Sequence, residues 1–224
     1  MGCMSILDVP LGKALRFIYA SPSLRRSMLK EDIRLERKKD AGGNRSKGGD
    51  YYVAFWSDVK KHISGDSDLT RLTAQRITSD KRLKRLYPQL RDGVLELLSA
   101  KLRWSNEVVE IFPQSVHGSL LVEEIGCTIR IRGALHARVR EDYIRIVYPY
   151  FSEDPALSEE GGRLGLWMMQ RALTNLDADD MRIIDPLRKT FFSPRVTPLQ
   201  GNEERVFRER YRSLIDEWEM LKRE

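Results

Sequence analysis

The basic side chains are the residues of this sequence with the clearest capacity for chemistry, and one dense group of them stands out. This group, which we call the basic cluster, consists of Lys81, Arg82, Lys84 and Arg85. Leu83, Leu86 and Leu90 recur through the same stretch at helical spacing, so we expect the four charges to point away from the core. Lysine and arginine at a helix end can neutralise the phosphates of a nucleic acid. A solvated helix flank is the alternative interpretation.

A second basic group lies where apolar and basic residues alternate, from Ile129 to Val139. Period-two alternation predicts a strand with one apolar face on the core and one basic face opposite. We call the basic residues of this segment and the next the sheet arginines: Arg130, Arg132, Arg138, Arg140 and Arg145. Their charges need acidic neighbours, open solvent or a polyanionic ligand, because like charges opposite one another destabilise a strand pair.

The alternation resumes from Tyr143 to Tyr148, which predicts an antiparallel hairpin. A turn of two or four residues would pair Val139 with Ile144 and would place Arg138 opposite Arg145. A three-residue loop would set apolar positions against polar ones, so the pattern favours the first register. This register predicts one buried face made of Ile131, Leu135, Val139, Ile144 and Ile146.

Metal binding and nucleophilic catalysis have little support in the sequence. The cysteines and histidines show no C-x-x-C or H-x-x-x-H spacing, and Gly161–Gly165 follows a loop where a dinucleotide fingerprint would follow a strand. We therefore predict no metal, no cofactor and no catalytic residue. An enzyme with an unfamiliar carboxylate site remains a third possibility, for which the candidate acids are Glu110, Glu123, Glu124 and Asp185.

Length and composition bound these possibilities. The 224 residues are enough for one or two domains with a substantial core, and 32% of them are charged. Residues 1–104 carry 22 Lys and Arg against 12 Asp and Glu, which leaves 17 against 21 in residues 105–224. This asymmetry indicates that the basic N-terminal half binds nucleic acid or an acidic protein. No apolar run approaches the ~20 residues of a membrane span, and two distant cysteines suggest a reducing cytoplasm.

The elements that must position these residues divide the chain into a helical half and a sheet half. Apolar spacing predicts helices over residues 4–20 and 23–39, a glycine-rich connector to residue 50, and further helices between residues 50 and 103. Strands are expected from residue 108 to 149, followed by a helix from Ser158, a short strand at 181–184 and a C-terminal helix. The fold class is therefore α+β, with a basic helical arm and connector at 1–50 and a core of an antiparallel meander flanked by helices at 51–224.

The order of helix, three-stranded meander, helix and further strand over residues 80–192 resembles the restriction-endonuclease-like (PD-(D/E)XK) core. In that family a Gly-x-x-Asp strand supplies a metal ligand, and the next strand carries (Asp/Glu)-x-Lys. The corresponding stretches here are Gly133-Ala134-Leu135-His136 and Tyr148-Pro149-Tyr150, which lack the carboxylates that magnesium requires. The resemblance implies a core without the cutting chemistry.

These observations favour a non-catalytic nucleic-acid-binding protein that uses the basic cluster and extends its surface over the sheet arginines. The alternative is a protein-interaction module whose basic face meets an acidic protein. Both interpretations place the protein in the cytoplasm and away from membranes.

Overall fold

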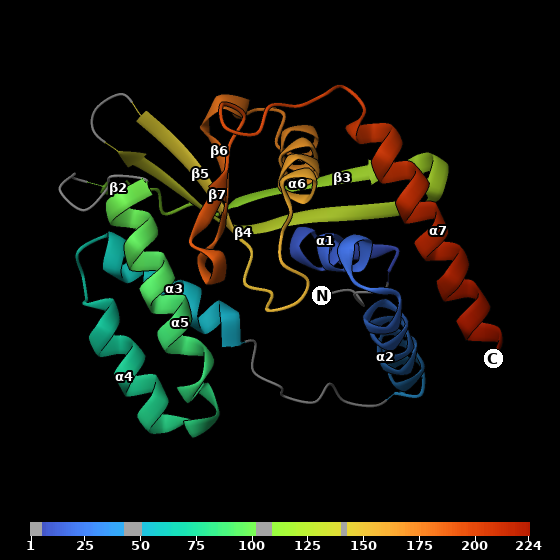
Figure 1. Cartoon of the computed structure of the whole chain (residues 1–224), viewed down its shortest axis with the longest axis horizontal. Helices are drawn as coiled ribbons and strands as arrows, with labels where there is room; N and C mark the ends of the chain where they lie inside the picture. Colours follow the sequence, from blue (N-terminus) through green and yellow to red (C-terminus); the bar gives the residue numbers. More distant parts are fainter. Residues whose placement is uncertain (1–5, 43–50, 102–108, 140–142) are drawn as a thin grey trace.

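The computed structural model describes residues 6–42, 51–101, 109–139 and 143–224 (Figure 1). The helices are α1 (Leu11–Tyr19), α2 (Pro22–Asp40), α3 (Tyr51–Ile63), α4 (Leu69–Ser79), α5 (Leu86–Glu96), α6 (Glu159–Ala172) and α7 (Glu203–Arg223). The strands are β1 (Asp8–Pro10), β2 (Val109–Ile111), β3 (Val116–Val122), β4 (Cys127–Val139), β5 (Tyr143–Pro149), β6 (Met181–Asp185) and β7 (Thr190–Phe192). Short helical turns are η1 (Lys81–Lys84), η2 (Leu97–Lys101), η3 (Glu123–Ile125), η4 (Ala178–Asp180) and η5 (Pro186–Arg188). The expected α+β class is confirmed.

The strands form one mixed sheet around the long strand β4. Its first half lies between β1, which is parallel to it, and the antiparallel β3. Its second half lies between the antiparallel strands β2 and β5, and β6 then adds parallel to β5. The expected antiparallel meander is therefore present as β3, β4 and β5, and parallel strands extend it on both sides.

The strand β4 changes its buried face at Gly133. This glycine has a φ of 74°, and the pairing with β3 passes from Ala134 to Arg132 without it, so Gly133 is the extra residue of a β-bulge. Ile131 before the bulge is buried in one core cluster, whereas Leu135 after it is buried in the other. A single alternation in the sequence therefore serves two opposite faces of the sheet.

The predicted hairpin register is wrong by one residue. Val139 pairs with Tyr143, and Arg138 pairs with Ile144. Arg145 consequently lies opposite Ala137, which places Arg138 and Arg145 on opposite faces of the sheet. Both sides of β5 are covered by helices, so its burial does not follow one parity: Ile146 and Val147 are both buried. Apolar parity could not identify the register because neither face is exposed to solvent throughout.

Two hydrophobic cores lie on either side of the sheet. Consecutive residues of β5 and β6 enter different cores, as Ile183 and Ile184 do. One core is covered by α1, α2, α6 and α7, and the other by α3, α4 and α5, so the molecule has helices on both sheet faces (Figure 1). The second group of helices holds the basic cluster.

The first described residues belong to the larger core. A helix was expected over residues 4–20, but residues 8–10 form the strand β1, and α1 begins only at Leu11. Phe17 and Leu29 are fully buried, and the Tyr211 hydroxyl of α7 donates to the Ile6 carbonyl at 2.7 Å. Asp32 is 3% exposed and forms an ion pair with Lys13. The described residues of the predicted arm at 1–50 therefore pack against the sheet and α7. None of the described helices combines the length and apolar character of a membrane span.

Candidate functional site

The basic cluster occupies the turn η1 between α4 and α5. The side chain of Asp80 accepts a hydrogen bond from the Arg82 backbone N–H at 3.0 Å and so caps the turn. Leu83 is 9% exposed and packs into the core, while all four basic side chains are exposed. The expectation that these charges point away from the core is confirmed.

Two of the four cluster charges are balanced by acids, and two are not. Arg82 forms an ion pair with Asp80 at 2.7 Å, and its hydrogen bonds hold the pKa of that carboxyl below its usual range. Arg85 pairs with Glu153 at 2.6 Å. Across the described ranges, Lys81 and Lys84 have no ion pair. Exposed pairs contribute little stability, so the arginines can exchange a carboxylate for another anion at small cost.

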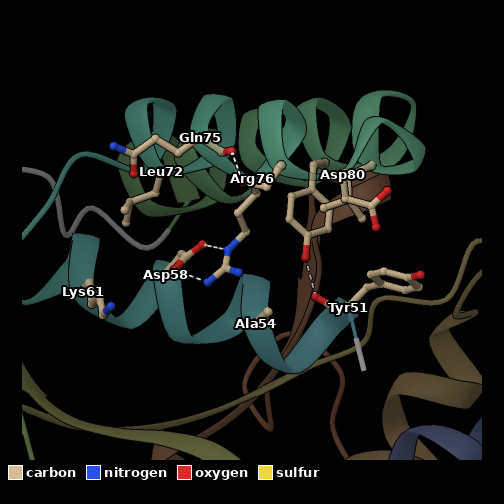
Figure 2. Close-up of a pocket in the computed structure, with 11 residues that line it drawn as sticks. Tyr51, Ala54, Asp58, Lys61, Leu72, Gln75, Arg76 and Asp80 are labelled. Atoms are coloured by element: carbon tan, nitrogen blue, oxygen red, sulfur yellow. Dashed lines mark hydrogen bonds and ion pairs between the residues drawn. The ribbon is translucent and has the colours of Figure 1, made fainter. Parts of the chain in front are cut away.

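An open cavity of about 410 Å³ lies beside the cluster, between α3 and α4 (Figure 2). Its lining residues are Tyr51, Ala54, Asp58, Lys61, Leu72, Gln75, Arg76, Ser79, Asp80, Leu83 and Tyr87. On α3 these residues follow spacings of three and four, so one helix face lines the cavity. Figure 2 shows Tyr51 and Lys61 at opposite ends of this face.

An ion pair between a buried aspartate and a partly exposed arginine closes the back of the cavity. Asp58 is 2% exposed and binds Arg76 through both carboxylate oxygens, with Nη2 at 2.9 Å from Oδ1. The two charges compensate each other, so this wall is close to neutral. Removing Arg76 would be costly because the charge of Asp58 would stay buried without a partner. The pair therefore fixes α4 against α3.

Tyr51 marks the mouth of the cavity. The residue is 37% exposed, and the Arg82 guanidinium lies over its ring at 5.5 Å from the centroid. The Tyr51 carbonyl accepts a hydrogen bond from the buried Tyr87 hydroxyl at 2.6 Å, which anchors the start of α3 on α5. An exposed aromatic ring beside a guanidinium offers both a stacking surface and a positive charge.

The sheet arginines do not form one surface. Arg130 and Arg132 precede the bulge and Arg138 follows it, so they lie on different faces of β4. Three of the sheet arginines have acidic partners: Arg130 with Asp8, Arg138 with Glu110 at 3.1 Å, and Arg145 with Asp180 at 3.1 Å. Arg132 is exposed, and Arg140 lies outside the described residues.

Arg145 is also remote from the basic cluster along the sheet. It pairs with Asp180, just before β6 begins, whereas Arg85 of the cluster pairs with Glu153, beyond the end of β5. These acids mark opposite ends of the parallel pair β5 and β6. The structure brings the four cluster residues together and does not join Arg138 or Arg145 to them.

The carboxylates considered for an enzyme site are spread over the fold. Glu110 pairs with the last residues of β4, while Glu123 and Glu124 precede its first residue. Asp185 ends β6 and is fully buried. In the described ranges, no group of three or more His, Cys, Asp or Glu side chains is placed to hold a metal ion.

The residues that the sequence resemblance compares with the nuclease motif make packing and hydrogen-bond contacts. The His136 ring lies 4.3 Å from the Phe112 ring. The Tyr148 hydroxyl accepts a hydrogen bond from the Gly12 N–H at 3.0 Å, and the Tyr150 hydroxyl donates to the Pro155 carbonyl at 2.8 Å. Both tyrosines thus secure neighbouring segments of the chain to β5.

Asp185 has an unusual environment for a carboxylate. Its Oδ1 accepts a hydrogen bond from the Arg188 N–H at 3.3 Å, while its Oδ2 has no hydrogen-bond partner in the described part of the chain. Burial raises the pKa of Asp185, and Arg188 opposes this increase only in part. The neutral form is therefore favoured in the folded protein relative to the unfolded chain.

Replacing Asp185 with asparagine should change how the free energy of unfolding depends on pH. An unfolded aspartate titrates near pH ~3.9, so stability from the neutral carboxyl is complete below that value and is lost as the pH rises through the raised folded pKa. Asparagine stays neutral, so the stability of Asp185→Asn relative to wild type should increase from about pH 4 upward. Urea unfolding of both proteins across this pH range measures the difference in their free energies of unfolding. If the two free energies change in parallel with pH, the pKa of Asp185 is not raised in the folded protein.

The sequence interpretation missed the cavity residues Tyr51, Lys61 and Gln75. A usable signal was present, because Tyr51, Asp58 and Lys61 share one face of a helix whose other residues are mostly apolar. The opposing face of α4 follows the same spacing, but nothing in the sequence pairs the two helices.

Comparison with known proteins identifies no family for this chain. No model of a known protein family matches the sequence, and no curated protein matches it at a significant level.

Proposed function

We propose that this protein binds nucleic acid without cutting it, through the basic cluster and the adjoining mouth of the cavity. The observation that carries the proposal is the position of Lys81 and Lys84, which form no ion pair with any described residue, on the same turn as Arg82, whose guanidinium lies over the exposed Tyr51. Positive charge attracts phosphates and the aromatic ring accepts a base, which together are the usual means of holding a nucleic-acid strand.

A non-catalytic role fits the residues at the nuclease-motif positions. The element order α5, β2, β3, β4, β5, α6 and β6 contains a helix, antiparallel strands, a helix and a further strand, which is the order on which the restriction-endonuclease-like resemblance is based. His136, Tyr148 and Tyr150 stand where that family places acids and a lysine, and none of them supplies a hard carboxylate oxygen for magnesium. We therefore propose a nuclease-like core that retains binding and lacks cutting chemistry.

Fluorescence anisotropy with labelled single-stranded DNA, RNA and duplex DNA tests the proposal. At low salt the wild-type protein should bind, and its affinity should fall steeply as salt is added, since binding releases counterions from the phosphates. Absence of binding to all three ligands at low salt would overturn the proposal and would make an acidic protein the better candidate partner. Magnesium-dependent cleavage by the purified protein would contradict the non-catalytic part.

Two double variants with equal charge loss test which basic residues take part. Lys81→Ala with Lys84→Ala should lower the slope of log affinity against log salt by up to about 1.4 for a single strand. Arg138→Ala with Arg145→Ala should leave that slope unchanged, because these arginines lie on opposite sheet faces and hold acidic partners. A larger effect of the arginine pair would restore the sheet arginines as the binding surface.

A further inference from the structure

The chemistry of the cavity between α3 and α4 determines which part of a ligand it can hold. Its volume of about 410 Å³ lies within the range of pockets for small organic groups, ~300–1,000 Å³. Ala54, Leu72 and Leu83 supply carbon surface inside it. Together with the mutual neutralisation of Asp58 and Arg76, this carbon surface favours a largely uncharged group over an ion.

The charges around the cavity separate an uncharged interior from a positive rim. The Asp58 carboxylate is already neutralised by Arg76 at the back wall, and Asp80 lies at the edge, so a phosphate inside would face two carboxylates, and among the described lining residues only Lys61, at one end, is a cation without an ion pair. Lys61 is exposed and has no ion pair across the described ranges, and Lys81 and Lys84 lie on η1. Phosphates are favoured outside the cavity, beside these lysines.

Polar groups at the cavity edge can contact a heterocycle. The Gln75 side-chain amide is exposed and forms no hydrogen bond with any described residue. The amide offers both donors and an acceptor, as base edges do. The Ser79 hydroxyl donates to the Gln75 carbonyl at 3.1 Å and keeps acceptor capacity. Tyr51 adds an aromatic face at the mouth.

We propose that this cavity receives an unstacked base of a single-stranded nucleic acid, with the neighbouring phosphates held by Lys61 and the basic cluster. The inference rests on the proposed function and specifies its substrate class. A base within a duplex is stacked and paired, so it would reach the cavity only at the cost of unpairing. Single strands of DNA or RNA present their bases freely and should bind more tightly than the duplex.

An oligothymidylate and a matched oligomer of abasic units test the inference, because the two share phosphates and differ only in their bases. Wild-type protein should bind the oligothymidylate about tenfold or more tightly than the abasic oligomer, as expected for base stacking. An oligouridylate and a thymidine–adenine duplex are two further ligands in the same binding experiment. The oligouridylate shows whether RNA is accepted, and the duplex should bind more weakly than either strand.

Ala54→Leu places a larger side chain in the cavity and narrows it, and its matched control is Ala74→Leu on the exposed face of α4. Ala54→Leu should lose the preference for the oligothymidylate and keep the affinity for the abasic oligomer, whereas Ala74→Leu should behave as wild type. If circular dichroism shows that Ala54→Leu does not fold, Tyr51→Ala is a second variant that should lose the preference for the oligothymidylate over the abasic oligomer.

The outcomes distinguish this inference from the proposed function. Equal affinity of wild type for the oligothymidylate and the abasic oligomer, unchanged by Ala54→Leu or Tyr51→Ala, would overturn base capture and leave phosphate binding in place. A duplex bound more tightly than both single strands would also overturn it. Absence of binding to every oligomer would overturn the proposed function and this inference together.

Discussion

Replacing Gly93 with alanine should destabilise the protein by about 3 kcal/mol, at the upper end of the cost of overpacking a core. Gly93 lies in α5 against η5, and a β-carbon built on it would meet the Pro186 carbonyl, with the carbonyl carbon only 2.6 Å away. The obstacle is backbone, so no side-chain rotation can relieve it. Alanine improves helix propensity by up to ~1 kcal/mol, which is too little to offset the clash.

Gly165→Ala is the matched control for this prediction. Gly165 is also inside a helix, α6, but the nearest atom to an added β-carbon is the terminal methyl of Ile183 at 2.5 Å, which can move. Chemical denaturation of the two variants measures the difference in the free energy of unfolding. Equal stability of Gly93→Ala and wild type would show that α5 does not sit directly on η5, and the cavity wall supplied by Tyr87 of α5 would then be misplaced.

The sequence predicts the helices and the orientation of the basic cluster well, because these depend on local apolar spacing. The C-terminal helix α7 carries Tyr211, Leu214 and Trp218 on its buried side, as its period implies. Leu83 of the cluster is buried and its charged neighbours are exposed for the same reason.

The sheet shows where periodicity stops being informative. A bulge at Gly133 leaves the apolar alternation of β4 intact in the sequence while exchanging its two faces. The three-residue strand β1 has too little length to show a period, and it is a strand because it pairs with Thr128 to Arg130. Both features depend on contacts with distant segments, which local patterns do not encode.

The cavity could not be predicted from local patterns either. Its walls come from α3, α4, η1 and α5, and its closure depends on the pairing of Asp58 with Arg76 across two helices. Each wall by itself is an ordinary amphipathic helix face. Only their juxtaposition produces a neutral interior with a positive rim.

Replacing all four basic-cluster residues with alanine should weaken binding to a single strand by about a hundredfold at low salt. A protein with six to ten phosphate contacts loses ~10³–10⁵ in affinity between 50 and 200 mM salt, and this scales to about a hundredfold for the up to four contacts of the cluster. Folding should be retained because the four side chains are exposed and Leu83 remains in place. Anisotropy with an oligothymidylate measures the loss, and circular dichroism checks the fold.

The matched control removes four other exposed basic side chains, on α2 and α7: Lys30, Arg34, Arg205 and Arg212. It lowers the net charge of the protein by the same amount. A general electrostatic attraction would weaken equally in both variants, whereas a specific interface weakens only when the cluster is removed.

The salt dependence of oligothymidylate binding tests the central claim most directly. If the basic cluster contacts phosphates, its removal should lower the magnitude of the slope of log affinity against log salt by up to about 2.8, at ~0.7 per contact for a single strand. The control variant should keep the wild-type slope. Equal slopes for the cluster variant and the wild type, with binding intact, would contradict the assignment of the cluster as the nucleic-acid interface.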